Sequence, residues 1–207
     1  MLNNCIKNSL SLLLVGFIFW GCTRDDTKYY ADGEDKGLAI FSNTYNNILS
    51  CYINDKPWRT FSRVLTGFTP RMHNEVEITR QPATTSKDTL IIQWHGYFET
   101  NQRNTADIRL HLALPAHATI NDLNALQGKR LIIDSTINGF FEINDAGINP
   151  ANIKANGHLY FNIASFNSIA PNTYTGDISG LFDADFSSVK ITKGRFDHFI
   201  SPEQILF

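Results

Sequence analysis

The sequence has only three cysteines in 207 residues, which limits the cross-links that the chain can form. Cys5 lies in an N-terminal leader that we expect to be removed, and Cys22 directly follows that leader. An intramolecular disulfide is then excluded, because Cys51 would be the one thiol left. Cys51 lies in the apolar run LSCYI at 49–53, so we expect a buried thiol rather than a nucleophile.

Positive charge is also scarce, and it is not clustered. The chain carries 18 Lys and Arg against 20 Asp and Glu, and loss of the leader removes one of these basic residues, Lys7. The slightly acidic chain that remains offers no electrostatic footprint for nucleic acid. The sequence also lacks a Gly-x-Ser-x-Gly motif and the glycine-rich loops that bind phosphates. We therefore expect no nucleic-acid partner, no cofactor and no enzymatic activity.

The sequence has no apolar run long enough to cross a membrane as a helix. Its longest one, LSLLLVGFIFW at 10–20, is about half of the ~20 residues that a span needs. A short start with one lysine, an apolar core and a small residue before the cut are typical of a secretory signal peptide. Gly21-Cys22 resembles the end of a bacterial lipobox, although Phe19 and Trp20 depart from the usual residues. The sequence thus predicts a lipoprotein signal peptide at 1–21.

Cys22 is the predicted lipidation site, and its acyl chains would hold the protein on a membrane. The polar stretch that follows, to residue 37, has no apolar periodicity and is expected to be a flexible tether. Asp25 and Asp26 resemble the surface-export signal of Bacteroidota lipoproteins, with a merely solvated linker as the alternative. We expect an outer-membrane lipoprotein of the cell envelope, exposed at the surface if that signal operates, with a single β domain at 38–207.

Short apolar runs separated by turn residues, typical of an all-β domain, fill the sequence from about Leu38. In DIRLHLAL, 107–114, every second side chain is apolar, which is the period of a strand. One short helix is expected near 121–127, with Asn121 as its N-cap and Gly128 at its end. We predict an antiparallel β-sandwich or barrel of roughly ten strands. The expected strands lie at 49–53, 57–61, 75–80, 89–99, 107–114, 130–134, 140–143, 157–166, 174–182, 188–192 and 194–200.

Two segments of the chain resemble a family of uncharacterised Bacteroidota lipoproteins. CYINDKPWRTF, residues 51–61, is similar to a v-N-G-k-x-W hairpin near the start of those domains, with Asp55 where Gly is common. YTGDISGLFDADFSSVKITKGRFDHF, residues 174–199, is similar to their closing strands, which carry the pattern v-x-I-T-x-G-x-F-D. The matching residues there are Val189, Ile191, Thr192, Gly194, Phe196 and Asp197. The resemblance implies a shared fold and no activity, because none is established for the family.

Candidate ligand contacts lie on the predicted strands 89–99 and 107–114. His95 and Tyr97 share one face of the first strand, and Arg109 and His111 point outward from the second. If these strands pair, the four side chains form a polar, partly aromatic patch. The alternative is that the histidines are solvated or bonded across strands, as on the wet face of an ordinary antiparallel sheet. No metal site is expected.

Other chemistry-bearing residues are expected to be structural. Asp183 and Asp185 in FDADF do not have the pattern of a calcium loop, and we expect them to be turn residues. Trp58 and Trp94 could line a sugar-binding surface, but rings of this kind more often fill a β core, which is the interpretation we favour.

Three functions remain open from the sequence. The first is a membrane-anchored envelope lipoprotein whose β domain binds a ligand without catalysis, a glycan or an envelope protein being the candidate partners. The second is a hydrolase acting on glycan or peptide, with acidic and histidine residues gathered in a barrel mouth. The third is a structural envelope component that assembles through an exposed strand edge.

Overall fold

The computed structural model describes residues 38, 47–60, 76–83, 86–98, 101–145 and 154–207. Backbone contacts divide the chain into units 1–30 and 31–207, and all described residues belong to the second unit. The predicted leader, the lipidation site Cys22, the acidic pair Asp25 and Asp26, and the tether to residue 37 lie outside the described residues.

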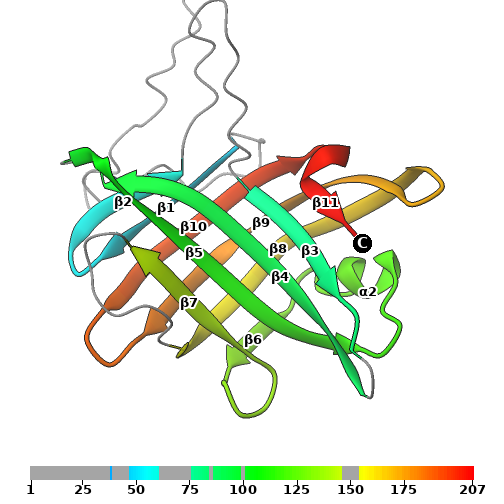
Figure 1. Cartoon of the computed structure of the whole chain (residues 1–207), viewed down its shortest axis with the longest axis horizontal. Helices are drawn as coiled ribbons and strands as arrows, with labels where there is room; N and C mark the ends of the chain where they lie inside the picture. Colours follow the sequence, from blue (N-terminus) through cyan, green and yellow to red (C-terminus); the bar gives the residue numbers. More distant parts are fainter. Residues whose placement is uncertain (1–37, 39–46, 61–75, 84–85, 99–100, 146–153) are drawn as a thin grey trace, which may run out of the picture. The chain divides into compact units, whose positions relative to one another are not determined.

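The described residues form eleven strands and one short α-helix, which confirms the all-β prediction (Figure 1). The elements, in chain order, are β1 (Ile48–Ile53), β2 (Lys56–Thr60), β3 (Val76–Gln81), β4 (Lys87–Phe98), β5 (Asn101–Pro115), α2 (Ile120–Asn124), β6 (Arg130–Ile133), β7 (Gly139–Asp145), β8 (Lys154–Ala170), β9 (Thr173–Asp185), β10 (Lys190–Ile200), the 3-10 helix η1 (Pro202–Gln204) and β11 (Ile205–Leu206). Among the described residues, no helix is long and apolar enough to span a bilayer.

Eight of the strands close into an antiparallel up-and-down barrel, so the barrel alternative is the one observed. Strands β1, β2, β4, β5, β7, β8, β9 and β10 each pair with the next one in this order, and β10 pairs back with β1. The remaining three are additions: β3 pairs with β4, β11 pairs in parallel with β3, and β6 pairs with β8. Closure gives each of the eight main strands a neighbour on both sides, although β8 beyond Tyr160 pairs with β9 alone.

The barrel interior is filled by aromatic and aliphatic side chains. Trp94 stacks on Phe182 with ring centroids 6.1 Å apart, and it meets Phe196 at 5.6 Å. Phe141 stacks on Phe182 at 5.7 Å, and Phe161 meets Phe196 edge-on at 5.8 Å. Such rings contribute most of the buried apolar area that stabilises a small barrel. The part of the interior lined by these residues is therefore a packed core and no ligand chamber.

Two glycines make room for these inward-facing rings. A Cβ on Gly180 would meet the Phe196 ring and the Tyr160 carbonyl oxygen, and a Cβ on Gly194 would overlap the Phe182 ring. Both glycines lie within the closing segment at 174–199. The Gly–aromatic alternation of that segment is thus a packing requirement of β9 and β10.

Helix α2 covers one end of the barrel (Figure 1). Its buried Leu123 and the following Leu126 lie against Ile78, Phe161 and neighbouring wall residues, around a residual cavity of about 10 Å³. The predicted N-cap, Asn121, is wrong: the helix begins after Thr119. Asp122 explains the earlier start, because its Oδ2 accepts hydrogen bonds from the Thr119 N–H (2.7 Å) and hydroxyl (2.9 Å).

The helix is also shorter than expected. It ends at Asn124 rather than near 127 and continues as turns as far as Gly128. Gly128 has φ +71°, a left-handed conformation that favours glycine, and its N–H donates to the Phe161 carbonyl at 2.8 Å. The helix itself ends four residues before Gly128, with Ala125 as its C-cap, so the prediction that Gly128 ends the helix is wrong.

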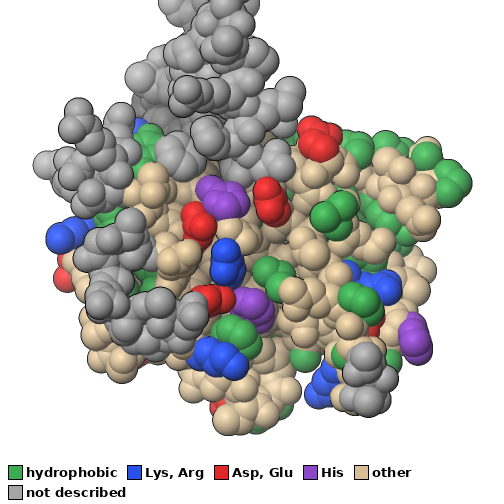
Figure 2. Space-filling model, in the orientation of Figure 1, with side chains coloured by type: hydrophobic (Ala, Val, Ile, Leu, Met, Phe, Trp, Pro, Cys, Tyr) green, Lys and Arg blue, Asp and Glu red, His purple; other side chains and the backbone are tan. Residues whose placement is uncertain are grey.

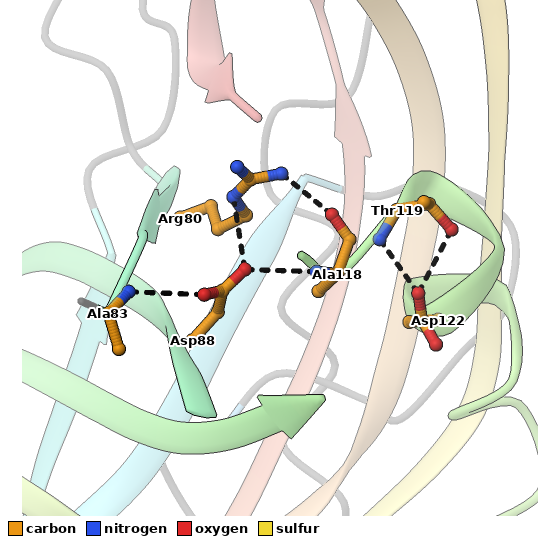
Figure 3. Close-up of polar contacts among 6 residues, drawn as sticks. All are labelled: Arg80, Ala83, Asp88, Ala118, Thr119 and Asp122. Carbon is orange, nitrogen blue, oxygen red and sulfur yellow. Dashed lines mark hydrogen bonds and ion pairs between the residues drawn. The ribbon is translucent and has the colours of Figure 1, made fainter. Parts of the chain in front are cut away.

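A buried carboxylate joins this end of the barrel to α2 (Figure 3). Asp88, 2 % exposed, accepts hydrogen bonds from the N–H groups of Ala83 (3.1 Å) and Ala118 (2.9 Å). Arg80 lies 3.4 Å from the same carboxylate and donates to the Ala118 carbonyl at 2.7 Å. The hydrogen bond from Ala83 is the main reason that the pKa of Asp88 is lowered. We call Arg80, Asp88 and Ala118 the β4 clasp.

Two predicted turns have different outcomes. Asn54 and Asp55 form the tight β1–β2 turn as predicted, with φ values of 48° and 61°. Asp183 and Asp185 are not turn residues: both are exposed, outward positions of β9, and the chain reverses after them at 186–189. The strand extends this far because the buried residues Phe182 and Ala184 alternate with the two exposed aspartates, so the two-residue period of a strand continues.

Candidate functional site

The four predicted contact residues all lie on the outer face of β4 and β5. These strands pair in a register that sets His95 opposite Asp107, Gln93 opposite Arg109, and Tyr97 opposite Thr105. On the other side of β5, Arg109 is opposite Glu142 of β7. Figure 2 shows acidic, basic and histidine side chains next to one another on the side of the molecule where Figure 1 shows β4, β5 and β7. We call this surface the polar face; it comprises Gln93, His95, Tyr97, Asp107, Arg109, His111 and Glu142.

The centre of the polar face is a chain of cross-strand hydrogen bonds. Asp107 accepts from Gln93 at 3.2 Å, and its other oxygen lies 2.9 Å from Nδ1 of His95. Arg109 donates from Nε to the Gln93 amide oxygen at 2.8 Å and lies 3.8 Å from Glu142. The donors and acceptors at the centre therefore largely satisfy one another.

His111 belongs to the same network through a different carboxylate. Its Nε2 lies 3.1 Å from Glu142, and its ring stacks on Phe140 with centroids 4.2 Å apart. His95 and His111 are four positions apart along the β4–β5 ladder, about 13 Å at the usual rise of a strand. They cannot share a metal ion at that separation. Among the described residues, no group of three or more His, Cys, Asp or Glu side chains could hold one.

The two histidines have pKa values shifted in opposite directions. The hydrogen bond to Asp107 raises the pKa of His95, whereas burial lowers the pKa of His111. The partners that cause these differences could not be found from the sequence, because periodicity gives the face of a side chain but not the register between strands.

Tyr97 is held from the other side by β2. Arg59 donates from Nε to the Tyr97 hydroxyl at 2.8 Å, and its guanidinium lies 5.3 Å from the centre of the tyrosine ring. The structure thus brings the four predicted residues onto one surface, and it places them in cross-strand pairs of the kind that the alternative interpretation described. Ligand contact at this face stays a prediction.

A second surface was missed by sequence reasoning. It is a groove of about 790 Å³ over the outer side of β6, β8, β9 and β10, which we call the β8–β9 groove. One row of paired residues crosses it: Arg130 is opposite Tyr160, Tyr160 is opposite Leu181, and Leu181 is opposite Arg195. A useful signal in the sequence was the apolar residues at outward positions, of which Ile132 is 71 % and Leu181 42 % exposed.

One cation of the groove differs from those of the polar face in its hydrogen bonding. Arg130 lies over the Tyr160 ring, 5.4 Å from its centre, and its guanidinium donates no hydrogen bond to any described residue. His158 and Asp183 form an exposed pair, 2.9 Å apart. Lys193 lies in the β-bulge of β10 with φ 53°, a feature that often re-aims side chains beside a binding site.

The remaining candidates belong to the core. Cys51 is fully buried, and burial raises the pKa of its thiol, so the prediction of a structural cysteine is confirmed. Trp58 and Trp94 are both fully buried and line the interior, as favoured from the sequence. None of these three side chains reaches either outer surface.

Comparison with known proteins adds no relative. The chain matches no protein-family model, and no curated protein or solved structure shows significant similarity to it. The resemblance of 51–61 and 174–199 to Bacteroidota lipoproteins stays a prediction.

Proposed function

We propose that this protein is a lipid-anchored binding protein of the bacterial cell envelope, whose β domain holds a ligand on its outer surface without changing it chemically. The anchor is Cys22, the tether follows it to residue 37, and a glycan is the ligand class we favour. A tether of this kind keeps the domain near the membrane, where a weak site gains from the high local concentration of envelope polymers.

The observation that carries the binding role is the contrast between a filled interior and an open groove. Small-ligand sites are concave, about 300–1,000 Å³, and mostly apolar with a few polar groups. The β8–β9 groove has a volume of about 790 Å³ and exposes Leu181 and Ile132 beside the guanidinium of Arg130, which donates no hydrogen bond to another described residue. The polar face, by contrast, has its donors and acceptors largely paired with one another.

Hydrolysis is the second candidate, and one observation favours it. His158 and Asp183 form a hydrogen-bonded pair inside the groove, the arrangement in which a carboxylate orients a histidine for acid–base chemistry. Assembly through a strand edge has less support, because the strands β6 and β11, which pair with one neighbour each, are only four and two residues long.

The anchoring half of the proposal is tested in the native host. Wild-type protein should incorporate labelled palmitate and sediment with outer membranes, whereas Cys22→Ser should do neither. Cys5→Ser is the matched control, because it removes a thiol from the expected leader without touching the lipidation site. Equal label and equal membrane association in the Cys22→Ser protein would contradict the anchor.

The binding half is tested with purified protein on a panel of envelope glycans and an envelope extract, beside a broad panel of hydrolase substrates. We expect saturable binding to at least one glycan and no turnover. Turnover that is lost in Asp183→Asn, and retained in Asp134→Asn outside the groove, would favour the hydrolase instead.

A further inference from the structure

The β8–β9 groove exposes a cation, Arg130, in a chain whose net charge is −2. Lys193 and Arg195 also line the groove, but each of them has an interaction partner of its own; Asp183 is the carboxylate in the lining. Asp183 is engaged by His158, whose ring Nδ1 and backbone N–H lie 2.9 and 3.2 Å from the same carboxylate oxygen. Asp183 is thus already engaged, whereas the Arg130 guanidinium forms no ion pair with another described residue and can meet an anion.

The groove also has an apolar strip that begins beside Arg130. In the row that crosses four strands, Tyr160 and Leu181 occupy the middle, with Arg130 at one end and the largely buried Arg195 at the other. Ile132 adds a further exposed apolar side chain on β6, beside Arg130. β6 and β10 are three strand spacings apart, about 14 Å, so a ligand touching both ends is longer than one sugar ring.

From this arrangement we infer that the β8–β9 groove binds an acidic glycan, whose pyranose rings lie on Tyr160 and Leu181 while a ring carboxylate meets Arg130. A uronate ring has an apolar C–H face and a carboxylate at its edge, which match the strip and the cation beside it. Arginine is the side chain best suited to the second contact, because its planar fork can bind a carboxylate with two parallel hydrogen bonds. The inference rests on the proposed binding function.

Two other polyanions fit this groove less well. An extended acidic peptide commonly binds by adding to a sheet edge, but β8 and β9 beneath the groove are paired on both sides there, and the open edge of β6 is only four residues long. A nucleic acid requires a broad positive surface, and the acidic chain offers none. Both become outcomes of the test.

The test measures binding of the full lipidated chain, in detergent, to hexamers of galacturonate, glucuronate and mannuronate, each beside its methyl ester. The ester keeps the sugar rings and removes the charge. We expect at least one acidic hexamer to bind about tenfold or more tightly than its ester. Arg130→Gln should reduce that preference about tenfold, and Tyr160→Ser should weaken both forms.

Controls separate this inference from the broader proposal. Lys87→Gln removes one positive charge from an exposed position of β4 outside the groove and should leave affinity unchanged. Thermal melting of Arg130→Gln should match the parent, because that side chain is exposed. Binding of every hexamer equally to its ester, equal affinity for polyglutamate or single-stranded RNA, or no effect of Arg130→Gln overturns the acidic-glycan inference. If a neutral envelope glycan still binds, the proposed binding function survives; if nothing binds and a substrate turns over, both fail.

Discussion

At the scale of single residues, His198 carries an imidazole inside the apolar barrel. It lies on β10 between the buried Phe196 and Ile200, is 1 % exposed, and has no hydrogen-bond partner among the described residues at either ring nitrogen. Burial lowers its pKa to about 3. The neutral ring is tolerated because the cost of burying it is far below that of burying an imidazolium.

His198 should make the protein less stable as the pH falls. Between an unfolded-state pKa of about 6.5 and the native value, the unfolded chain binds a proton that the native barrel does not, so the free energy of unfolding decreases with falling pH. We expect His198→Leu to remove about 2 kcal/mol of the loss measured between pH 7 and pH 5 by urea unfolding. The exposed His117→Asn is the control, and parallel pH profiles for parent and His198→Leu would contradict the prediction.

The polar face gives a second prediction at this scale. By NMR titration, His95 should ionise above the usual histidine value and His111 below it, because Asp107 stabilises the charged form of the first and burial disfavours that of the second. Asp107→Asn should lower the pKa of His95 and leave His111 nearly unchanged, so His111 is an internal control. Identical titration of the two rings in the parent would rule out the described geometry.

For single residues, the sequence predicted whether a side chain points into the barrel or outward. Alternation along the strands placed His95, Tyr97, Arg109 and His111 outward and Trp94 inward, as the structure has them. It could not give their partners, because Asp107 and Glu142 meet them through a register set by the whole barrel. The groove was missed for the same reason. Arg130 and Arg195 are 65 residues apart in the sequence, and they come to lie on one row of residues only when four strands pair.

At the scale of elements, the hydrogen bonds of the β4 clasp fix the position of the segment that connects β5 to α2. Asp88 holds the start of β4 to Ala83 and to Ala118, which precedes the helix cap at Thr119 (Figure 3). We expect Asp88→Asn to lower the melting temperature by about 5–10 °C at pH 7. The Asn amide would point an N–H group toward one of the backbone N–H donors that Asp88 now accepts from, and that buried or half-buried donor would lose its acceptor.

The effect of Asp88→Asn should depend on pH in a defined direction. The native pKa of Asp88 lies below its unfolded value, so its stabilising contribution is present above the unfolded value near 4 and is lost as the pH falls through the native one. The gap in melting temperature between parent and variant should therefore shrink at pH 3 and below. Asp183→Asn on exposed β9 is the control and should change little at either pH; a gap that widens in acid would refute the clasp.

The positions of the strands could be predicted best from the sequence, whereas the closure of the sheet into a barrel could not be predicted. Period-two patterns located most of the strands that the structure contains, because each is buried on one face and wet on the other. Helix length was overestimated because the helix ends at Asn124, even though the pairing of Asp122 with Thr119 moves its start earlier than expected. Sandwich and barrel share the same strand patterns, and the choice between them depends on the pairing of β1 with β10, which lie more than 130 residues apart.

At the scale of the whole molecule, closure leaves the outer wall as the place for the proposed ligand contacts. The eight strands surround an interior that Trp94, Phe182 and Phe196 fill, and the β8–β9 groove lies over the outer wall. A rigid wall is a good support for a binding surface, because paired strands fix the positions of Arg130, Tyr160 and Leu181 without ordering cost on binding.

Closure also predicts that the barrel opens as one unit, and Cys51 can report it. Cys51 is buried on β1, which is paired with β2 on one side and β10 on the other, so its thiol becomes accessible only when both pairings break. The experiment uses protein with Cys5 and Cys22 replaced by Ser and labels Cys51 at pH 8. Labelling should be slower than that of an exposed thiol, and the free energy calculated from this slowing should match the free energy of unfolding measured with urea within about 1 kcal/mol. Ser188→Cys at an exposed turn, in a Cys51→Ala background, should react at once. Labelling of Cys51 that is much faster than global unfolding would mean that the β1–β2 hairpin detaches separately, because a cooperative closed barrel has no smaller opening that exposes this thiol.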